Sequence, residues 1–172
     1  MNPFLRGLCV LVVASTTAAC SGPESDRELA LEALRTRAEA SGYAETSRYQ
    51  DVMGFLEAVV PLDDRMHLTT FGSSHEGRAL PLVVVGAPSA SADAVRATGK
   101  VRVYLQGNIH GGEVPGKESL QMLLREIAQG RHDALLDSLV LLVAPIYNAD
   151  GNERVALTNR PLQHGPLGGM GQ

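Results

Sequence analysis

The sequence predicts an α/β fold in which a mixed β-sheet is flanked by helices. Apolar runs of strand length alternate with segments that have the apolar spacing of amphipathic helices. A β-helix-β unit over residues 101–146 implies a parallel pair of strands with a right-handed crossover. The short link between residues 66–71 and 79–85 implies an antiparallel pair. A sheet that contains both kinds of pair is mixed.

The predicted elements follow from apolar spacing, from proline and glycine, and from loop composition. In chain order they are a linker and amphipathic helix over residues 21–43, a helix over 50–60 that ends before Pro61, strands over 66–71 and 79–85, a loop over 86–99, a strand over 101–105, a helix over 114–128 and a strand over 139–146. The last strand has no polar interruption, which predicts burial on both faces. A turn is expected at residues 148–151, and the fold is expected to be incomplete at its C-terminus.

The composition is that of a globular chain. Of the 172 residues, 44% are hydrophobic and 20% are charged, and the formal net charge is −4. The chain has no basic stretch and only 4% aromatic residues, so no nucleic-acid partner is expected. Cys9 and Cys20 are the only cysteines. A disulfide framework and a cysteine-based zinc site are therefore excluded from the rest of the chain.

Residues 1–20 have the pattern of an export signal. Arg6 supplies a positive charge, residues 8–13 are apolar, and small residues precede Cys20. The end of this segment resembles a bacterial lipobox, in which the cysteine is lipidated, although Thr17 stands where an aliphatic residue is usual. We therefore predict a lipoprotein-type signal peptide and a location in the periplasm or outer membrane of a bacterium, with membrane contact only through a lipid anchor at Cys20. A plain secretory cleavage and a buried N-terminal helix are the alternatives.

His110 and Glu113 are the candidate metal ligands. They lie in a glycine-rich turn between the predicted strand 101–105 and helix 114–128. Ligands bind at the carboxyl ends of strands in open α/β sheets. An imidazole nitrogen and a carboxylate oxygen supply two of the three protein ligands that a catalytic zinc needs. The alternative is that Glu113 caps the helix beside an ordinary loop histidine, and the four-residue match alone does not decide between the two.

Four segments, one of which contains His110 and Glu113, occur in an order that is typical of one protein family. They are Ser74-His75-Glu76-Gly77-Arg78, Asn108-Ile109-His110-Gly111-Gly112-Glu113, Pro145-Ile146-Tyr147-Asn148-Ala149-Asp150-Gly151 and Asn159-Arg160. They resemble, in turn, the Ser-x-Glu-Gly-Arg stretch, the metal-binding turn, the Asn-Pro-Asp-Gly region and an Asn-Arg pair of the M14 family, the zinc carboxypeptidases of the carboxypeptidase A type. The resemblance covers residues 44–172, which we interpret as part of one peptidase domain.

This resemblance implies a zinc carboxypeptidase-like fold, Zn²⁺ as the cofactor and a peptide as the substrate. His110 and Glu113 would be zinc ligands. Arg160 is assigned to substrate binding, with a solvent-exposed loop arginine as the alternative. Asp150 and Gly151 would shape the turn after the last strand, with a plain Asp-Gly turn as the alternative, and Arg78 is expected to have a structural role. The implied activity is hydrolysis of C-terminal peptide bonds or related amide bonds.

The sequence also departs from the family pattern. Gly111 and Gly112 occupy the positions between the histidine and the glutamate, where pancreatic-type members carry an arginine. Gln163 stands where an oxyanion-stabilising arginine is often found. The family's third zinc ligand and general base would follow Gln172, so we expect this chain to be catalytically inactive. The other four histidines are not expected to be ligands; they are His67, His75, His132 and His164.

Two other functions are left open by the sequence. One is a zinc deacylase of the aspartoacylase type, which uses a similar His-x-x-Glu pair to cleave an N-acyl amino acid. The other is a non-catalytic lipoprotein that keeps the fold for binding, and it would have no tight zinc site. The Ser-x-Glu-Gly-Arg and Asn-x-Asp-Gly resemblances favour the peptidase over the deacylase.

Overall fold

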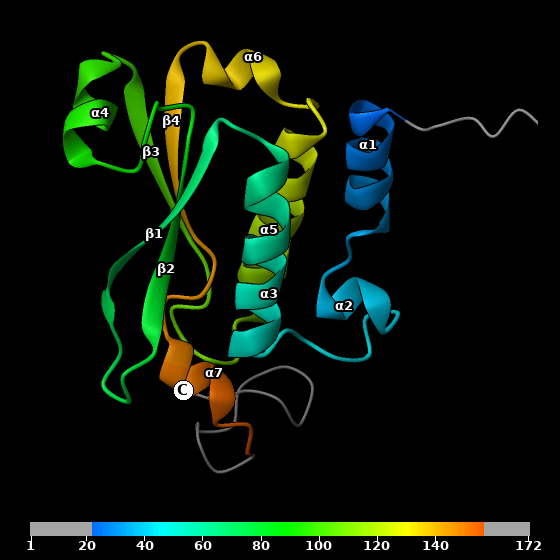
Figure 1. Ribbon diagram of the computed structural model, residues 1–172. Coiled ribbons are helices and arrows are strands. Elements are labelled where there is room, and N and C mark those ends of the chain that lie inside the picture. Colours follow the sequence, from blue (N-terminus) through cyan, green and yellow to red (C-terminus); the bar gives the residue numbers. More distant parts are fainter. Residues whose placement is uncertain (1–21, 157–172) are drawn as a thin grey trace, which may run out of the picture.

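A four-stranded mixed sheet is the centre of the fold (Figure 1). The computed structural model describes residues 22–156. Its strands are β1 (Met66–Ser73), β2 (Ala79–Val85), β3 (Val101–Gln106) and β4 (Leu139–Ala144), and their order across the sheet is β1-β2-β4-β3. β1 and β4 each pair antiparallel with β2, whereas β3 and β4 are parallel. The predicted mixed α/β sheet is confirmed.

The helices lie mainly on one face of this sheet. They are α1 (Pro23–Ala33), α2 (Arg37–Ala40), α3 (Tyr49–Val59), α4 (Ala92–Ala97), α5 (Val114–Ala128), α6 (Asp133–Leu136) and α7 (Ala149–Glu153), and a 3₁₀ turn spans Val60–Leu62. Figure 1 shows α3 and α5 side by side against the sheet, with α1 and α2 outside them. In the part of the chain that the structure describes, no helix has both the length and the apolar content needed to cross a bilayer.

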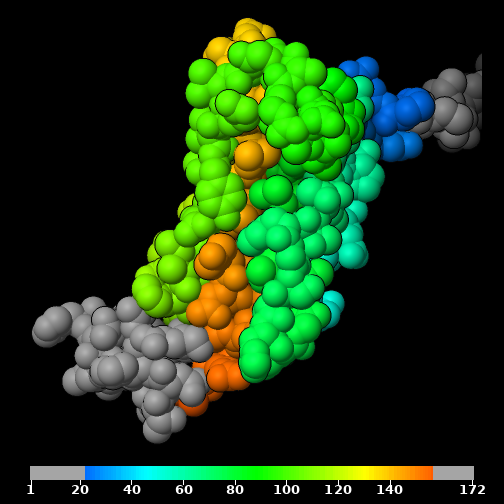
Figure 2. Space-filling view, turned by 90° about the vertical axis from the view of Figure 1, so that its left-hand side faces the viewer, coloured from blue at the N-terminus to red at the C-terminus, as the bar shows by residue number. Residues whose placement is uncertain are grey.

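The main core lies between the sheet and helices α3 and α5. Its fully buried side chains include Val52, Leu56, Val59, Val83, Val85, Leu124, Ile127 and Val143. A smaller cluster on the opposite face lies between the sheet and α4 and consists of Val84, Ala87, Val95 and Val140. Because β2 and β4 have apolar side chains on both faces, they lack the polar alternation of a half-exposed strand. Figure 2 looks onto this second face, where orange residues from β4 to α7 are visible between green strands.

The single helix expected within residues 21–43 is divided into α1 and α2. The division occurs because Thr36 and Glu39 form a capping box. The Thr36 hydroxyl accepts from the Glu39 amide at 3.2 Å, and the Glu39 carboxylate accepts from the Thr36 amide at 2.9 Å. The apolar spacing continues through this point, so it gave no sign of the break.

Two segments expected to be irregular contain short helices. The expected loop over residues 86–99 includes α4, which begins after Ser91, whose side chain accepts a backbone hydrogen bond at the helix start. The expected turn at 148–151 is the start of α7, and Asn148 caps it in the same way. In both cases a capping side chain, rather than apolar periodicity, determines where the helix begins.

Candidate metal site

The turn between β3 and α5 places His110 and Glu113 side by side. The distance between His110 Nδ1 and Glu113 Oε1 is 2.6 Å, and the backbone amide of His110 donates to Glu113 Oε2 at 3.1 Å. Both side chains are close to half exposed, so a cation can reach them from solvent. The turn follows the carboxyl end of β3, where the sequence predicted the site. The structure therefore brings the two predicted ligands together.

Asn108 shapes this turn from within. Its φ of 57° is in the left-handed region, which asparagine adopts more readily than most residues other than glycine. Its Nδ2 donates to the carbonyl oxygens of His110 at 3.2 Å and Gly111 at 3.0 Å. The residue is 2% exposed. Asn108 thus fixes the backbone through the candidate ligands, a role that the sequence analysis did not assign to it.

Close backbone packing holds the turn against α5. A Cβ at Gly107 would lie 2.7 Å from the carbonyl carbon of Gly116 and 2.8 Å from the amide nitrogen of Lys117, so only glycine fits there. The Gly107 carbonyl oxygen also accepts from the amide of Tyr147 at 3.1 Å. The turn is therefore attached to α5 on one side and to the segment after β4 on the other.

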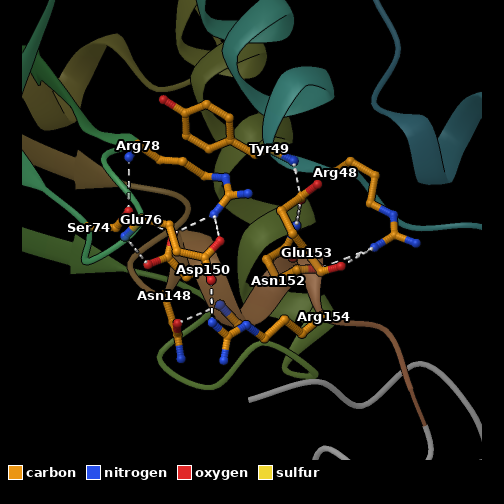
Figure 3. A network of polar contacts seen from close by, with 11 residues as sticks. Arg48, Tyr49, Ser74, Glu76, Arg78, Asn148, Asp150, Asn152, Glu153 and Arg154 are labelled. Carbon is orange, nitrogen blue, oxygen red and sulfur yellow. Dashed lines mark hydrogen bonds and ion pairs between the residues drawn. The ribbon is translucent and has the colours of Figure 1, made fainter.

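A second polar cluster joins the β1–β2 hairpin to α7 (Figure 3). We call it the hairpin cluster, and it consists of Ser74, Glu76, Arg78, Asp150 and Arg154. Asp150 accepts from the Ser74 hydroxyl at 2.7 Å, from the Glu76 amide at 2.9 Å and from Arg78 Nη1 at 2.6 Å. Arg78 also pairs with Glu76 Oε2 at 2.7 Å, and Arg154 pairs with the same carboxylate. These contacts fit the structural role expected for Arg78.

The electrostatics of Asp150 follow from these contacts. Burial by itself raises the pKa of this carboxyl, but the hydrogen bonds from Ser74, the Glu76 amide and Arg78 outweigh it and lower the pKa to about 2. Asp150 is therefore ionised at neutral pH and acts as an anchor for the hairpin rather than as a proton donor.

The other described histidines do not join His110 and Glu113 in a larger donor group. His67 Nε2 is 2.8 Å from the carbonyl oxygen of Ala87, and His132 Nε2 is 3.0 Å from Glu126 Oε2. Within residues 22–156, no group of three or more His, Cys, Asp or Glu side chains is arranged to hold a metal ion. This part of the chain therefore provides two adjacent donors.

The residues that the sequence analysis assigned to lipidation and to substrate binding, Cys20 and Arg160, lie outside the described residues, as do Asn159, Gln163 and His164. The lipidation of Cys20 and the substrate contact of Arg160 therefore stay predictions.

Solved structures of carboxypeptidases share this fold. The carboxypeptidase A from Helicoverpa armigera matches with a TM-score of 0.54 and 17% identity over 74% of this chain and 32% of that chain. A metallo-carboxypeptidase from Burkholderia cenocepacia matches with a TM-score of 0.51 and 23% identity over 62% of this chain and 28% of that chain. At these identities the likeness shows the fold alone.

Curated relatives are more similar in sequence. Carboxypeptidase 2 from Trichophyton rubrum is 33% identical over 119 residues, which are 67% of this chain and 22% of the relative. The protein of the same name from Trichophyton equinum matches with the same identity and coverage. This chain thus spans about a fifth of the length of the relatives.

The location predicted from residues 1–20 is wrong on this comparison. These curated relatives are fungal, whereas the periplasm and outer membrane that we predicted are bacterial compartments. The physical reason is that a positive charge, an apolar run and small residues are common to export signals. The pattern before Cys20 therefore does not distinguish a bacterial lipoprotein signal from another export signal.

The sequence profile of one family matches most of the described chain. The profile is that of the zinc carboxypeptidases, Peptidase_M14, and it matches residues 53–165. The matched range includes β1 to α7 and therefore both the His110–Glu113 turn and the hairpin cluster. The chain belongs to the zinc carboxypeptidase family.

Proposed function

We propose that this chain is part of a zinc-dependent carboxypeptidase in which His110 and Glu113 bind the zinc ion. The observation that carries the proposal is the 2.6 Å distance between His110 Nδ1 and Glu113 Oε1 in a member of the zinc carboxypeptidase family. The donor set fits zinc, which binds imidazole nitrogen and carboxylate oxygen. The exposure of both side chains also fits a site that is loaded from solvent.

The proposed substrate of the whole protein is a peptide that is cleaved at its C-terminal bond, or a related amide. A bound zinc ion supplies polarisation of the scissile carbonyl and a water with a lowered pKa. The residues of this chain hold that site in place: Asn108 fixes the turn, and the packing of Gly107 on Gly116 fixes the turn to α5. Arg160 is proposed to contact the substrate. The names of the curated relatives support the carboxypeptidase activity.

We propose that the 172-residue chain alone does not hydrolyse peptides. A catalytic zinc site needs three protein ligands, and residues 22–156 bring together two donors. The measurement is hydrolysis of a panel of peptides and N-acyl amino acids by the purified chain, with and without a chelator. Turnover that the chelator abolishes would contradict this proposal, and the substrate that is cleaved would separate a peptidase from a deacylase.

Zinc affinity tests the proposed ligands directly. We expect His110→Ala and Glu113→Gln each to weaken zinc binding by about tenfold or more, because each removes a donor. The matched control is His132→Ala, which disrupts the His132–Glu126 pair near the C-terminal end of α5 and should leave zinc affinity unchanged. Equal zinc affinity in the wild-type chain and His110→Ala would refute the proposed site.

A further inference from the structure

Lys117 is a buried cation that the proposed chemistry does not use. It lies in α5 one helical turn after Glu113, and its side chain is 0% exposed. Its ammonium group donates to the carbonyl oxygen of Ser47 at 2.5 Å and to Oδ1 of Asn152. These contacts connect α5 to the residues before α3 and to α7.

The neighbouring residue, Glu118, binds the same segment before α3. Its carboxylate accepts from the Ser47 amide at 2.7 Å, from the Ser47 hydroxyl at 3.0 Å and from the Thr46 hydroxyl at 2.8 Å. Lys117 therefore contacts the carbonyl group of Ser47 while Glu118 contacts its amide. We call Lys117, Glu118, Ser47 and Asn152 the buried clamp. All four residues are less than 5% exposed.

Asn152 carries the clamp into α7. Its Nδ2 donates to the Ser47 carbonyl oxygen at 3.2 Å and to Glu153 Oε1 at 3.0 Å. The Glu153 carboxylate in turn accepts from the Tyr49 amide at 2.8 Å (Figure 3). The start of α3, the first turns of α5 and the last two residues of α7 thus meet in one hydrogen-bonded cluster.

The buried clamp joins α5 to α7, and the turn that holds His110 and Glu113 is attached to both of these helices. Glu113 is the residue directly before α5. At the other end of the turn, the Asn108 carbonyl oxygen accepts from the amide of Asn148, which caps α7, at 2.9 Å. Lys117 links α5 to α7 through Asn152. A shift of one helix against the other would therefore pull on both ends of the turn that holds His110 and Glu113.

The energetics of burial give Lys117 no evident advantage in stability. Removing a cation from water costs several kcal/mol, and apolar replacements of buried ionic groups are often as stable as the original. Exceptions to the usual pattern of burial occur most often at functional sites. A fully buried lysine one turn from a candidate metal ligand therefore suggests a role in arranging that site.

We propose that Lys117 is a positioning residue for the metal site. By joining α5 to α7, it holds Glu113 and His110 in the arrangement that binds zinc. The inference rests on the proposed function, because it requires that His110 and Glu113 are zinc ligands. It goes beyond that function by assigning part of the zinc affinity to a residue that touches neither the metal nor the substrate.

The test compares two lysine substitutions in the full chain. Lys117→Met keeps an unbranched side chain that is one atom shorter and removes its hydrogen bonds. Lys100→Met is the matched control, because Lys100 also donates to backbone carbonyl groups, those of Leu136 at 2.5 Å and Gly86 at 3.5 Å, but lies at the opposite end of β3. We expect Lys117→Met to weaken zinc binding by about tenfold or more, as removal of outer-shell groups does, and Lys100→Met to leave it unchanged. Zinc affinity is measured by chelator competition well below the unfolding temperature of each metal-free variant.

A second pair of variants covers the case in which Lys117→Met does not fold. Asn152→Ala removes an acceptor of Lys117, whereas Asn152→Asp keeps an oxygen at that position. The proposal expects zinc affinity to fall in Asn152→Ala and to be restored in Asn152→Asp. Unchanged affinity in Lys117→Met, or an equal loss in the two Asn152 variants, would overturn it.

The wild-type chain and His110→Ala separate the two proposals. If zinc affinity is the same in both, the proposed metal site fails and this inference fails with it. If affinity depends on His110 but not on Lys117, only the positioning role is wrong.

Discussion

Asp150 is the residue whose protonation should most directly weaken the contact between the hairpin and α7. Hydrogen bonds lower its pKa from 3.8 to about 2, so the folded state binds this proton less tightly than the unfolded chain does. The carboxylate therefore contributes stability that is fully present above about pH 4 and is lost as the pH falls toward 2. We expect Asp150→Asn to lower the urea midpoint at pH 7, and we expect the difference from wild type to shrink between pH 4 and pH 2.

An exposed aspartate provides the control for Asp150. Asp93 pairs with Arg96 at 2.5 Å, but both side chains are more than half exposed. Surface pairs of this kind contribute little to stability. Asp93→Asn should therefore leave the urea midpoint unchanged across the same pH range. If the urea midpoints of Asp150→Asn and wild type differ by the same amount at every pH from 7 down to 2, the proposed role of Asp150 as an anchor is contradicted.

Lys117 should make stability depend on pH in alkaline solution, and here too stability should rise with pH. Burial lowers its pKa from 10.5 to about 8, an effect that Glu118 and Glu153 oppose and Arg48 reinforces. Between pH 8 and pH 10.5 the unfolded chain binds this proton and the folded protein increasingly does not, so stability rises with pH. We expect wild type to gain stability relative to Lys117→Met over this range. Urea unfolding at pH 7, 8, 9 and 10 measures the gain. A difference in stability between wild type and Lys117→Met that stays the same at all four pH values would disprove it.

The candidate ligands were predictable from sequence, but the residues that hold them were not. His110 and Glu113 lie in one turn, so their approach follows from local geometry. Lys117, by contrast, contacts Ser47 and Asn152, which are 70 and 35 residues away from it in the sequence. In a helical pattern a lysine is normally assigned to the exposed face. Its burial follows from tertiary contacts that the pattern of apolar residues does not contain.

At the scale of elements, the fit of the turn after β3 against α5 depends on one glycine. A Cβ at Gly107 would meet backbone atoms at 2.7–2.9 Å, and backbone cannot rotate away as a flexible side chain can. We expect Gly107→Ala to destabilise the protein by about 1–3 kcal/mol, as overpacking does. Denaturant unfolding measures the loss.

Gly116 is the matched control for Gly107. A Cβ there would lie 3.4 Å from the Gly107 Cα, which is an ordinary contact. Because alanine also favours the helix by about 1 kcal/mol relative to glycine, Gly116→Ala should be neutral or stabilising. If Gly107→Ala changed the free energy of unfolding no more than Gly116→Ala does, the proposed close backbone fit would be wrong.

The elements that the sequence predicted well are those with long apolar signals. The expected helix over residues 114–128 has the bounds of α5, and the expected strands match β1 to β4 to within two residues at each end. The helices α4, α6 and α7 have four to six residues each, too few for a 3.6-residue period to be recognised. Side-chain caps mark the starts of α4 and α7, and α6 has no such cap. The loop-like composition of these segments therefore concealed all three helices.

For the molecule as a whole, the N-terminal helices pack as part of the same core as the sheet. Leu31 of α1 is 2% exposed within the main core. Arg125 of α5 binds the Glu39 carboxylate with two nitrogens, at 2.6 and 2.7 Å, and its hydrogen bonds lower the pKa of Glu39. The sequence placed residues 21–43 outside the peptidase domain, and the family match begins only at residue 53. The packing indicates that a protein trimmed to the matched range would lose part of its core.

Two leucines of α1 test this arrangement within one helix. Leu31 is buried, whereas Leu29 is 58% exposed. We expect Leu31→Ala to lower the free energy of unfolding by about 2–4 kcal/mol, the usual cost of emptying a core site, and Leu29→Ala to change it by less than about 0.5 kcal/mol. Deletion of residues 22–40 should destabilise the protein at least as much as Leu31→Ala, because it also removes the partner of Arg125. If the deleted protein unfolds at the wild-type denaturant midpoint, α1 and α2 are an appendage, and the domain begins where the family match begins.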